Sequence, residues 1–509
     1  MSTDFQSFLH ASKSYTTVPV FERFFLDMIT PIQIFQKLKE NACFLLESKD
    51  SESPWSRYSF IGIDPFLILK EEENRFVARK KNGEVFTEHD SFREALNNTM
   101  KMLNPKPVGI QLPFSGGGVG YISHDGITEF EKNIDPHPEN DLNITRFHFA
   151  FCEMILAYDH DQKELIVVSN VFVEEKDDET KRKLKYDLAK EKIKLTMDCL
   201  LESEAAPFPL FQMPEETSEV SFEHVRTNFE KQDFLNAVEK VKAYIAKGEI
   251  SQAVISQRFD LDLTVSGLDI YRVLRVINPS PYLFYMKIDD FEIVGSSPEK
   301  LVQINGKHIE IHPIAGTRHR GKTEEEDKQL AQELLNDKKE RAEHIMLVDT
   351  AKEDIGRVAE EGSVQVPDLM YIGRFSHVMH IISKVTGKLA DDAQPVDALI
   401  SAFPAGTLSG SPKKRAVEII HEIEPLARNL YGGAIGYIGF DGNIDSCITI
   451  RSVFIKDQKA YVQAGAGIVA DSVPEREWEE TRNKAKALIK AIEIAENLFH
   501  KKEAAANHV

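Results

Sequence analysis

The 509-residue chain predicts an α+β fold, because its strand and helix patterns do not alternate in the strict order of a doubly wound sheet. Short strand patterns with Gly and Pro punctuation fill residues 24–173. Strong helix patterns come later, one over 232–247 and one that begins near Pro474. Gly248 is expected to end the first of these helices, and a strand over 253–263 is expected to follow it.

The composition is that of an ordinary globular protein, with 42% apolar and 28% charged residues. The net charge of −20 disfavours nucleic acid or an anionic membrane as the main partner, because both would repel the chain. No apolar run is long enough to span a bilayer, and the first residues lack a signal-peptide pattern. The 4 cysteines have no paired spacing and indicate neither a disulfide framework nor a zinc site. We therefore expect a reduced, cytoplasmic protein.

Shifts in composition divide the chain into three predicted parts. These are an N-terminal domain, a helix with a linker, and a second domain, over residues 20–175, 176–225 and 226–498. The linker is expected at 205–222, which is rich in Pro, Glu and Ser. The helix before it would bury a thin apolar stripe of Leu184, Leu188, Ile193 and Leu195.

One internal repeat connects the two large parts. Residues 116–126 match residues 432–442 at seven of eleven positions, including a Tyr-Ile pair and a final Asp-Gly. Each copy is expected to form a short strand and then a hairpin turn, at Asp125-Gly126 and at Asp441-Gly442. Chance similarity is the alternative.

Two acidic helix segments predict a magnesium site. Glu340 and Glu343 are three residues apart and share a helix face, as do Glu477 and Glu480 on the last helix. Apolar neighbours such as Trp478 would partly desolvate these carboxylates, and Mg²⁺ prefers oxygen ligands that include one or two carboxylates. From the spacing alone, a solvated acidic helix face is the stronger explanation.

Arg451 is expected in a strand over 448–455 that carries no other charge. A guanidinium in such a strand needs a carboxylate or phosphate partner, unless the strand lies at an edge and the side chain reaches water. Downstream, residues 465–467 offer consecutive backbone N–H groups that would suit an anion, although glycines also simply end strands.

Two other segments have structural explanations that compete with functional ones. His377 and His380 lie among apolar neighbours, where a hydrogen-bonded core histidine is the better explanation for either one alone. Residues 409–415 suggest phosphate binding, but they lack the spacing of a P-loop and fit the start of a helix equally well.

Taken together, these segments resemble the chorismate-utilising enzymes, and most closely the anthranilate synthase component I family. The resemblance runs from about residue 248 to 489 and rests on strings that occur in the family's order, at 295–299, 313–318, 342–349, 376–380, 403–410, 431–433, 464–469 and 471–475. In the first half, residues 45–48 and 57–62 look like the family's N-terminal region.

The resemblance implies antiparallel β-sheets in a sandwich-like arrangement, helices packed outside, and N-terminal strands that mix with the catalytic domain. It implies that Mg²⁺ is held by Glu343 and Glu480 and bridges to a carboxylate of chorismate. It implies chorismate contacts from Gly316, Thr317, Thr407, Tyr431, Arg451, Gly465, Ala466 and Gly467.

The same resemblance implies the two catalytic groups. Glu299 would be the acid that assists loss of the C4 hydroxyl group, with its pKa raised by nearby carboxylates. His380, rather than His377, would act in the elimination of pyruvate. The implied reaction is a magnesium-dependent lyase reaction that forms anthranilate from chorismate and ammonia.

Two positions separate this reaction from those of other family members. Isochorismate-forming relatives carry a lysine base where this chain has Gln252, whose amide cannot deprotonate water. Aminodeoxychorismate synthase component I, the main alternative, carries a nucleophilic lysine where this chain has Ala315. A regulatory homologue without catalysis is a further alternative, but it would lack some of the acid, metal and elimination residues, which are all present.

The family is usually inhibited by tryptophan, the end product of the pathway that anthranilate enters. The expected inhibitor pocket consists of Ser48, Pro281, Tyr282 and Leu283. No cysteine lies in a Gly-x-Cys-x-Gly elbow, so the chain has no amidotransferase nucleophile of its own. The implied partner is a separate glutamine amidotransferase subunit, component II, in a heterotetramer.

Overall fold

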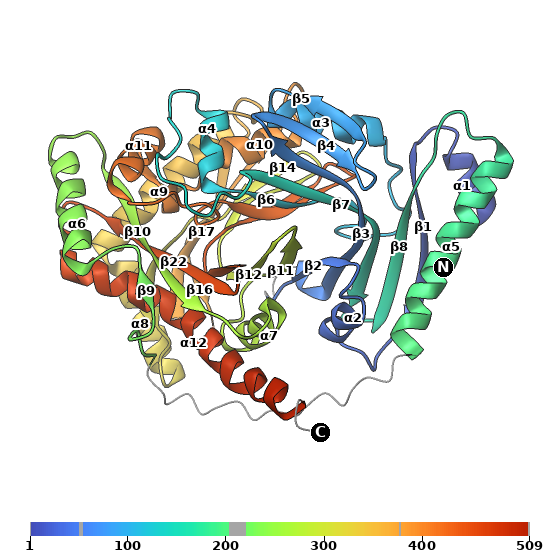
Figure 1. Cartoon of the computed structure of the whole chain (residues 1–509). Helices are drawn as coiled ribbons and strands as arrows, with labels where there is room; N and C mark the ends of the chain where they lie inside the picture. The colour runs from blue at the N-terminus through green and yellow to red at the C-terminus, as the bar shows by residue number, and fades with distance from the viewer. Residues whose placement is uncertain (1, 50–53, 203–219, 376–377, 507–509) are drawn as a thin grey trace.

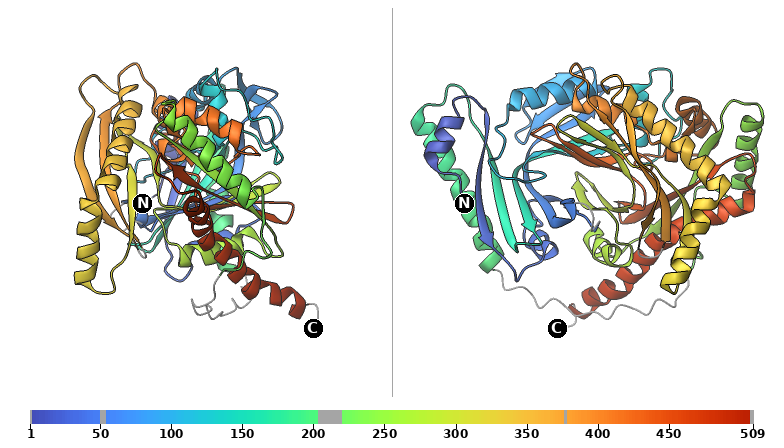
Figure 2. Two further views of the ribbon diagram at one scale, coloured as in Figure 1. Left: turned by 90° about the vertical axis from the view of Figure 1, so that its left-hand side faces the viewer. Right: turned by 180° about the vertical axis from the view of Figure 1, so that it is seen from behind.

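The computed structural model describes residues 2–49, 54–202, 220–375 and 378–506 (Figure 1). Within these residues, the strands form one 22-stranded sheet in which neighbouring strands pair antiparallel. The sheet is bent, with α1 and α5 against one end and α6, α11 and α12 near the other (Figures 1 and 2). The predicted α+β fold with antiparallel strands and outer helices is confirmed, although the strands form one continuous sheet.

The described residues up to 202 contribute the first strands and helices. The strands are β1 (Thr17–Phe25), β2 (Ala42–Glu47), β3 (Tyr58–Glu72), β4 (Arg75–Lys80), β5 (Val85–His89), β6 (Gly117–Ile122), β7 (Phe147–Asp159) and β8 (Glu164–Phe172). The helices are α1 (Phe5–Ala11), α2 (Pro31–Lys37), η1 (Pro54–Arg57), α3 (Phe92–Leu103), η2 (His124–Gly126), α4 (Ile127–Phe130) and α5 (Glu179–Glu202).

The described residues from 220 onward contribute the remaining elements. The strands are β9 (Arg226–Thr227), β10 (Gln252–Asp262), β11 (Tyr282–Ile288), β12 (Phe291–Ser297), β13 (Lys300–Asn305), β14 (His308–Ile311), β15 (Ile314–His319), β16 (Gln365–Arg374), β17 (Val378–Lys388), β18 (Gly410–Ser411), β19 (Ala434–Gly439), β20 (Ile444–Ile448), β21 (Ser452–Lys456) and β22 (Lys459–Ile468). The helices are α6 (Lys231–Ala246), α7 (Gly267–Ile277), α8 (Glu324–Asn336), α9 (Lys338–Gly356), α10 (Pro395–Ala402), η3 (Gly406–Leu408), α11 (Lys413–Ile423) and α12 (Pro474–Ala506).

Local sequence sets the two helices that carry the predicted metal ligands. The Asp337 side chain accepts hydrogen bonds from the backbone N–H groups of Lys339 and Glu340 and so caps α9. Pro474 is the first residue of α12, where its missing N–H costs no helical hydrogen bond. Lys339 at the start of α9 pairs with Asp471 just before α12, 3.3 Å away, which brings the two helix starts together.

The two copies of the internal repeat each contain a strand, β6 and β19, and these strands pair with each other. Gly120 of β6 lies opposite Gly436 of β19. A Cβ atom on Gly120 would lie 1.8 Å from the His148 carbonyl oxygen, and one on Gly436 would lie 2.2 Å from that of Asp445. These two glycines therefore allow β7 to approach β6 and β20 to approach β19 closely. At the seam itself, a Cβ on Gly117 would lie 2.1 Å from the Ile438 carbonyl oxygen.

The turns that follow the repeat differ. Asp441 and Gly442 form the predicted hairpin turn between β19 and β20. Asp125 and Gly126 instead lie in η2, which leads into α4, so the predicted first hairpin is wrong. The carboxylate of Asp125 accepts a hydrogen bond from the Asn429 backbone N–H at 2.8 Å, a contact to the other half that replaces the turn.

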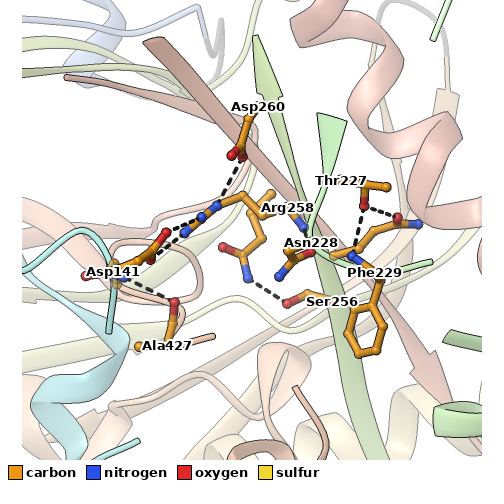
Figure 3. Close-up of polar contacts among 11 residues, drawn as sticks. Asp141, Thr227, Asn228, Phe229, Ser256, Arg258, Asp260 and Ala427 are labelled. Carbon is orange, nitrogen blue, oxygen red and sulfur yellow. Dashed lines mark hydrogen bonds and ion pairs between the residues drawn. The ribbon is translucent and has the colours of Figure 1, made fainter. Parts of the chain in front are cut away.

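Further contacts join the two halves. β2 pairs with β11, where Glu47 lies opposite Leu283. Figure 3 shows the guanidinium of Arg258, in β10, between Asp141 of the N-terminal half and Asp260, and the Arg258–Asp141 contact includes a hydrogen bond of 3.0 Å. N-terminal strands mix with those of the second half, as the resemblance implied. The domain boundaries at 175 and 226 stay a prediction.

The apolar stripe predicted for α5 is wrong. Leu184, Leu188 and Leu195 are 57%, 46% and 58% exposed, and only Ile193 is buried. The helix instead packs on β1 and β8 through Tyr186, Ala189, Ile193, Met197 and Leu200. The buried face repeats at the helical interval but lies on another side of the helix from Leu184, Leu188 and Leu195, and most of its residues are not leucine. Most of the predicted linker, 205–222, lies outside the described residues. Among the described helices, none combines the length and apolar character that crossing a bilayer requires.

Candidate functional site

Glu299 follows β12 directly and is held by η3. The hydroxyl of Thr407 donates a hydrogen bond to Glu299 Oε1 at 2.8 Å, and both residues line one pocket. Burial raises the pKa of Glu299 to about 7, whereas the Thr407 hydrogen bond and the Lys484 charge lower it. The predicted cause, nearby carboxylates, is wrong, because loss of solvent alone raises this pKa. A carboxyl group with this pKa donates protons near neutral pH.

A bulge in β15 places Gly316 and Thr317 beside His380. The register between β15 and β17 shifts between Ala315 and Arg318, and Gly316 has a φ of +64°, which favours glycine. His380 Nδ1 lies 2.8 Å from the Gly316 carbonyl oxygen and 3.1 Å from Thr317 Oγ1. Because a carbonyl only accepts, Nδ1 carries the proton and Nε2 keeps its lone pair. Burial lowers the pKa of His380, so the ring is neutral and can act as a base.

Arg451 does not lie in a strand, contrary to the prediction. It lies between β20 and β21 with a φ of +51°, a left-handed conformation that interrupts the strand pattern. Its Nη1 donates to the Lys484 carbonyl oxygen at 2.6 Å. Burial lowers its pKa, and Tyr431 and Glu480 act against this shift. None of the ion pairs within 4.0 Å among the described residues involves Arg451, so its guanidinium is suited to an anionic ligand.

The glycine segment 465–467 is part of β22 and pairs with β10. Lys484 Nζ donates to the Gly465 carbonyl oxygen at 2.9 Å, so this peptide group faces away from β10. Since successive residues of a strand face alternate edges, Gly465 and Gly467 face the open edge and Ala466 faces β10. The predicted run of three N–H groups is therefore reduced to two. The Tyr431 hydroxyl closes this edge, 2.9 Å from where a Cβ on Gly465 would lie.

Lys484, on α12, is the residue of this site that the sequence reasoning missed. Its Nζ lies 2.8 Å from Glu480 Oε1, and its charge lowers the pKa of both Glu299 and Glu343. The available signal was the spacing of four residues from Glu480, which puts the two side chains on one helix face.

Comparison with known proteins assigns the family. A family model described as chorismate binding enzyme matches residues 41–490. The chain is 52% identical to anthranilate synthase component 1 of Geobacillus stearothermophilus over 499 residues, which is 98% of each protein. This chain belongs to the chorismate binding enzyme family.

Other relatives agree with this assignment. Anthranilate synthase component 1 of Bacillus subtilis (strain 168) is 48% identical over 506 residues, covering 98% of this chain and 97% of the relative. The crystal structure of anthranilate synthase component I from Streptococcus pneumoniae TIGR4 matches with a TM-score of 0.71 and 35% identity, covering 86% and 94% of the two chains. MenF, the menaquinone-specific isochorismate synthase from Escherichia coli, matches with a TM-score of 0.67 at 19% identity, which supports a shared fold alone.

The glutamates expected to bind metal in this chorismate binding enzyme lie near one another on α9 and α12. Burial raises the pKa of Glu343, and the charges of Glu340 and Glu480 raise it further. Burial also raises the pKa of Glu477, again with a contribution from Glu480. Repelling, partly desolvated carboxylates are stabilised by a cation, and an all-oxygen donor set suits Mg²⁺. The residues present therefore fit a magnesium ion.

Gln252 and Ala315, which distinguish branches of the family, both lie at this site. Gln252 is buried at the start of β10, and its Nε2 lies 2.6 Å from where a Cβ on Gly467 would be. Ala315 precedes the Gly316 bulge. The side chains at both positions therefore lie beside groups expected to contact chorismate.

The other two candidate segments are not brought into the site. His377 lies outside the described residues. Residues 409–415 lead into α11, where Lys413 Nζ pairs with Asp354 at 2.9 Å. The start of a helix accounts for this segment, and its lysine is committed to a carboxylate.

The residues predicted for the inhibitor pocket, Ser48, Pro281, Tyr282 and Leu283, line one pocket. The pocket lies where β2 pairs with β11 and continues to β19 and β20. Its other lining residues are Leu46, Glu47, Tyr58, Phe60, Phe284, Ile435, Gly436, Tyr437, Asp445 and Cys447. Aromatic walls with a few polar groups are typical of small-molecule sites.

Proposed function

We propose that this chain converts chorismate and ammonia to anthranilate, pyruvate and water, the first committed reaction of tryptophan biosynthesis. The observation that carries the proposal is the convergence of Glu299, His380 and Arg451 beside the Glu343–Glu480 pair. The naming of relatives that are about half identical over nearly their full length supports the anthranilate branch.

Chorismate has two carboxylates, and the site offers a distinct group for each. One carboxylate would approach the metal held by Glu343 and Glu480, and Mg²⁺ bound there would neutralise its charge. The other would be held by Arg451 together with the N–H groups of Gly465 and Gly467. Gly316, Thr317, Thr407, Tyr431 and Ala466 would contact the ring and side chain.

The first stage needs an acid. Ammonia forms a bond to ring carbon C2 while the C4–O bond breaks, and Glu299 donates the proton with which the hydroxyl leaves as water. A pKa of about 7 keeps Glu299 substantially protonated at neutral pH. Thr407 orients the carboxyl group through its hydrogen bond.

The second stage needs a base. His380 Nε2 takes the proton from C2, the ring becomes aromatic, and the C3–O bond breaks to release pyruvate as its enolate, which is then protonated. The hydrogen bond from His380 Nδ1 to the Gly316 carbonyl holds the ring in the tautomer that this step requires.

Ammonia is expected as the nucleophile, because the site has neither a base that would activate water nor a lysine that would attack the ring. Gln252 offers an amide, which is no base for water, and Ala315 offers no amine for covalent attack on the ring. Free ammonia would reach C2 directly. In the cell, a glutamine amidotransferase subunit would supply that ammonia, in a heterotetrameric, cytoplasmic complex, and tryptophan would inhibit by binding the pocket that Ser48 lines.

The test is an anthranilate fluorescence assay with the purified full chain, chorismate, Mg²⁺ and ammonium at mildly alkaline pH. We expect a signal that chelation of Mg²⁺ abolishes and that tryptophan suppresses. Chorismate consumption without anthranilate would contradict the proposal and favour aminodeoxychorismate or isochorismate formation, which chromatography of the products distinguishes.

Ala315→Lys should abolish or divert anthranilate formation. The new lysine side chain would lie beside Gly316. As the neutral amine it would compete with ammonia for the ring, and as the ammonium ion it would add a positive charge to the site. The products are analysed by chromatography. Ala315→Ser is the control, because it changes the same position without adding an amine. An unchanged yield of anthranilate from the lysine variant would refute the role given to Ala315.

Glu299→Gln should lower kcat by roughly 10²–10⁴-fold, the usual contribution of a general acid. For the wild type, kcat at constant free ammonia should fall as pH rises above about 7, because Glu299 loses the proton that it must donate. Thr407→Val removes a hydrogen bond that lowers this pKa, so it should move the fall to higher pH. A pH profile that is the same for wild type and Thr407→Val would contradict the acid role.

Ser48→Phe should leave the reaction intact and raise the tryptophan concentration needed for inhibition at least tenfold, because the larger ring fills the pocket. Inhibition curves at fixed chorismate measure the effect. Leu283→Met, a nearly volume-conserving change in the same pocket, is the matched control and should stay sensitive. Unaltered inhibition of the phenylalanine variant would place the tryptophan site elsewhere.

A further inference from the structure

A buried cluster of His124, Asp125 and His421 lies outside the site described above. His124 and Asp125 belong to η2, at the place where the first repeat departs from the hairpin of the second, and His421 lies in the last turn of α11. One potential ligand atom of each residue lies within 4.8 Å of those of the other two. His124 is fully buried and Asp125 is 7% exposed.

Four polar atoms of this cluster have no partners among the described residues. Both ring nitrogens of His124, Oδ1 of Asp125 and Nε2 of His421 are buried without a hydrogen bond. Leaving a buried polar atom unpaired is destabilising, and here four such atoms lie together. A group that binds all three side chains at once would give three of these four atoms a partner.

The contacts on the far side of two of these residues match those of metal ligands. His421 Nδ1 donates to the Asp135 carbonyl oxygen at 3.1 Å, which leaves the lone pair of Nε2 directed to the cluster. Asp125 Oδ2 accepts from the Asn429 N–H at 2.8 Å, which leaves Oδ1 for the cluster. Ligands to a metal are commonly held in this way by a second hydrogen bond.

A neighbouring histidine shows the contrast. The ring of His137 lies 5.5 Å from that of His421, but its Nδ1 contacts Glu139 and its Nε2 contacts the Glu424 carbonyl oxygen, each at 3.0 Å. Both nitrogens of His137 are therefore used. The positive charge of nearby Arg428 is paired with Glu424, 2.6 Å away. This pairing reduces the repulsion between Arg428 and a cation bound to the cluster.

We propose that His124, Asp125 and His421 bind a zinc ion. Two imidazoles and a carboxylate form a donor set that Zn²⁺ favours, with a fourth position for water. Ligand atoms on a tetrahedral zinc ion lie roughly 3.4 Å apart, so small side-chain rotations bring these three into place. The proposal rests on histidines and is independent of the cysteines, which indicate no zinc site, and of the proposed reaction.

The position of the cluster gives the ion a structural role. The His124 ring lies 3.3 Å from where a Cβ on Gly432 would be, directly beside Tyr431. A zinc ion would tie η2 of the N-terminal half to α11 and hold both against this segment. It would thus stabilise the seam between the halves and the position of Tyr431.

The test uses the full chain, freed of metal with a chelator and then titrated with Zn²⁺ in saturating Mg²⁺, which blocks the carboxylates of α9 and α12. We expect one saturable zinc equivalent by calorimetry and elemental analysis. His421→Gln should weaken binding at least tenfold, and His308→Gln, at an exposed histidine, should not. Absence of saturable binding, or equal binding by His421→Gln and wild type, would overturn the proposal.

A second variant guards against misfolding. His124→Phe removes two unpaired buried nitrogens at similar size, so without zinc its Tm should equal or exceed that of the wild type. A hundredfold excess of Zn²⁺ over Kd should raise the wild-type Tm by roughly 2–3 °C and leave that of His124→Phe unchanged. Co²⁺ in place of Zn²⁺ should give visible absorption bands that both variants lose. Equal zinc-induced Tm shifts in wild type and His124→Phe would also overturn the proposal.

Discussion

The antiparallel pairing of β6 with β19 is the contact on which the rest of the structure depends. It makes one sheet of two sequence halves, and at this seam Gly117 allows the backbone to approach the Ile438 carbonyl oxygen of β19. Because the sheet is continuous, the N-terminal half is part of the site's framework rather than an appended domain. The pocket that Ser48 lines lies at a second such pairing, between β2 and β11, so it forms only when the halves are joined.

The chemistry of the site depends on charged residues that are far apart in the sequence but close together in the structure. Lys484 is central, because it pairs with Glu480, accepts Arg451 through its carbonyl group and lowers the pKa of Glu299. Without substrate or metal, this lysine partly balances the glutamates of α9 and α12. An anionic substrate with a divalent cation would complete the balance, since Arg451 has no carboxylate partner among the described residues. The charges of the site are therefore not fully paired within the protein, and they are complementary to a charged ligand.

The fold class and the family were predictable from the sequence, because the motif strings occur in the family's order even where the periodicity is weak. The roles given to the individual site residues stay predictions. Local geometry was less predictable. Arg451 has the neighbours of a strand residue, and only its φ of +51° shows that the strand has ended. The rise in the pKa of Glu299 comes from burial, which depends on η3 and thus on long-range packing. The apolar stripe of α5 and the first hairpin turn failed for the same reason: tertiary contacts, with β1 and with Asn429, override the local pattern.

The pocket that Ser48 lines is connected to Glu299 through the paired strands β11 and β12. Tyr282 lies opposite Ser297 in the β11–β12 pair, two residues before Glu299. The Ser297 hydroxyl donates to the Ile448 carbonyl oxygen at 2.7 Å, and the Ile448 N–H donates to that of Glu299 at 3.0 Å. A ligand that displaces Tyr282 therefore has to move β12 or strain its contacts with β20. Such a ligand would act on Glu299 only if it bound two arrangements of these strands with different affinity, because these backbone bonds link the position of Glu299 to both strands.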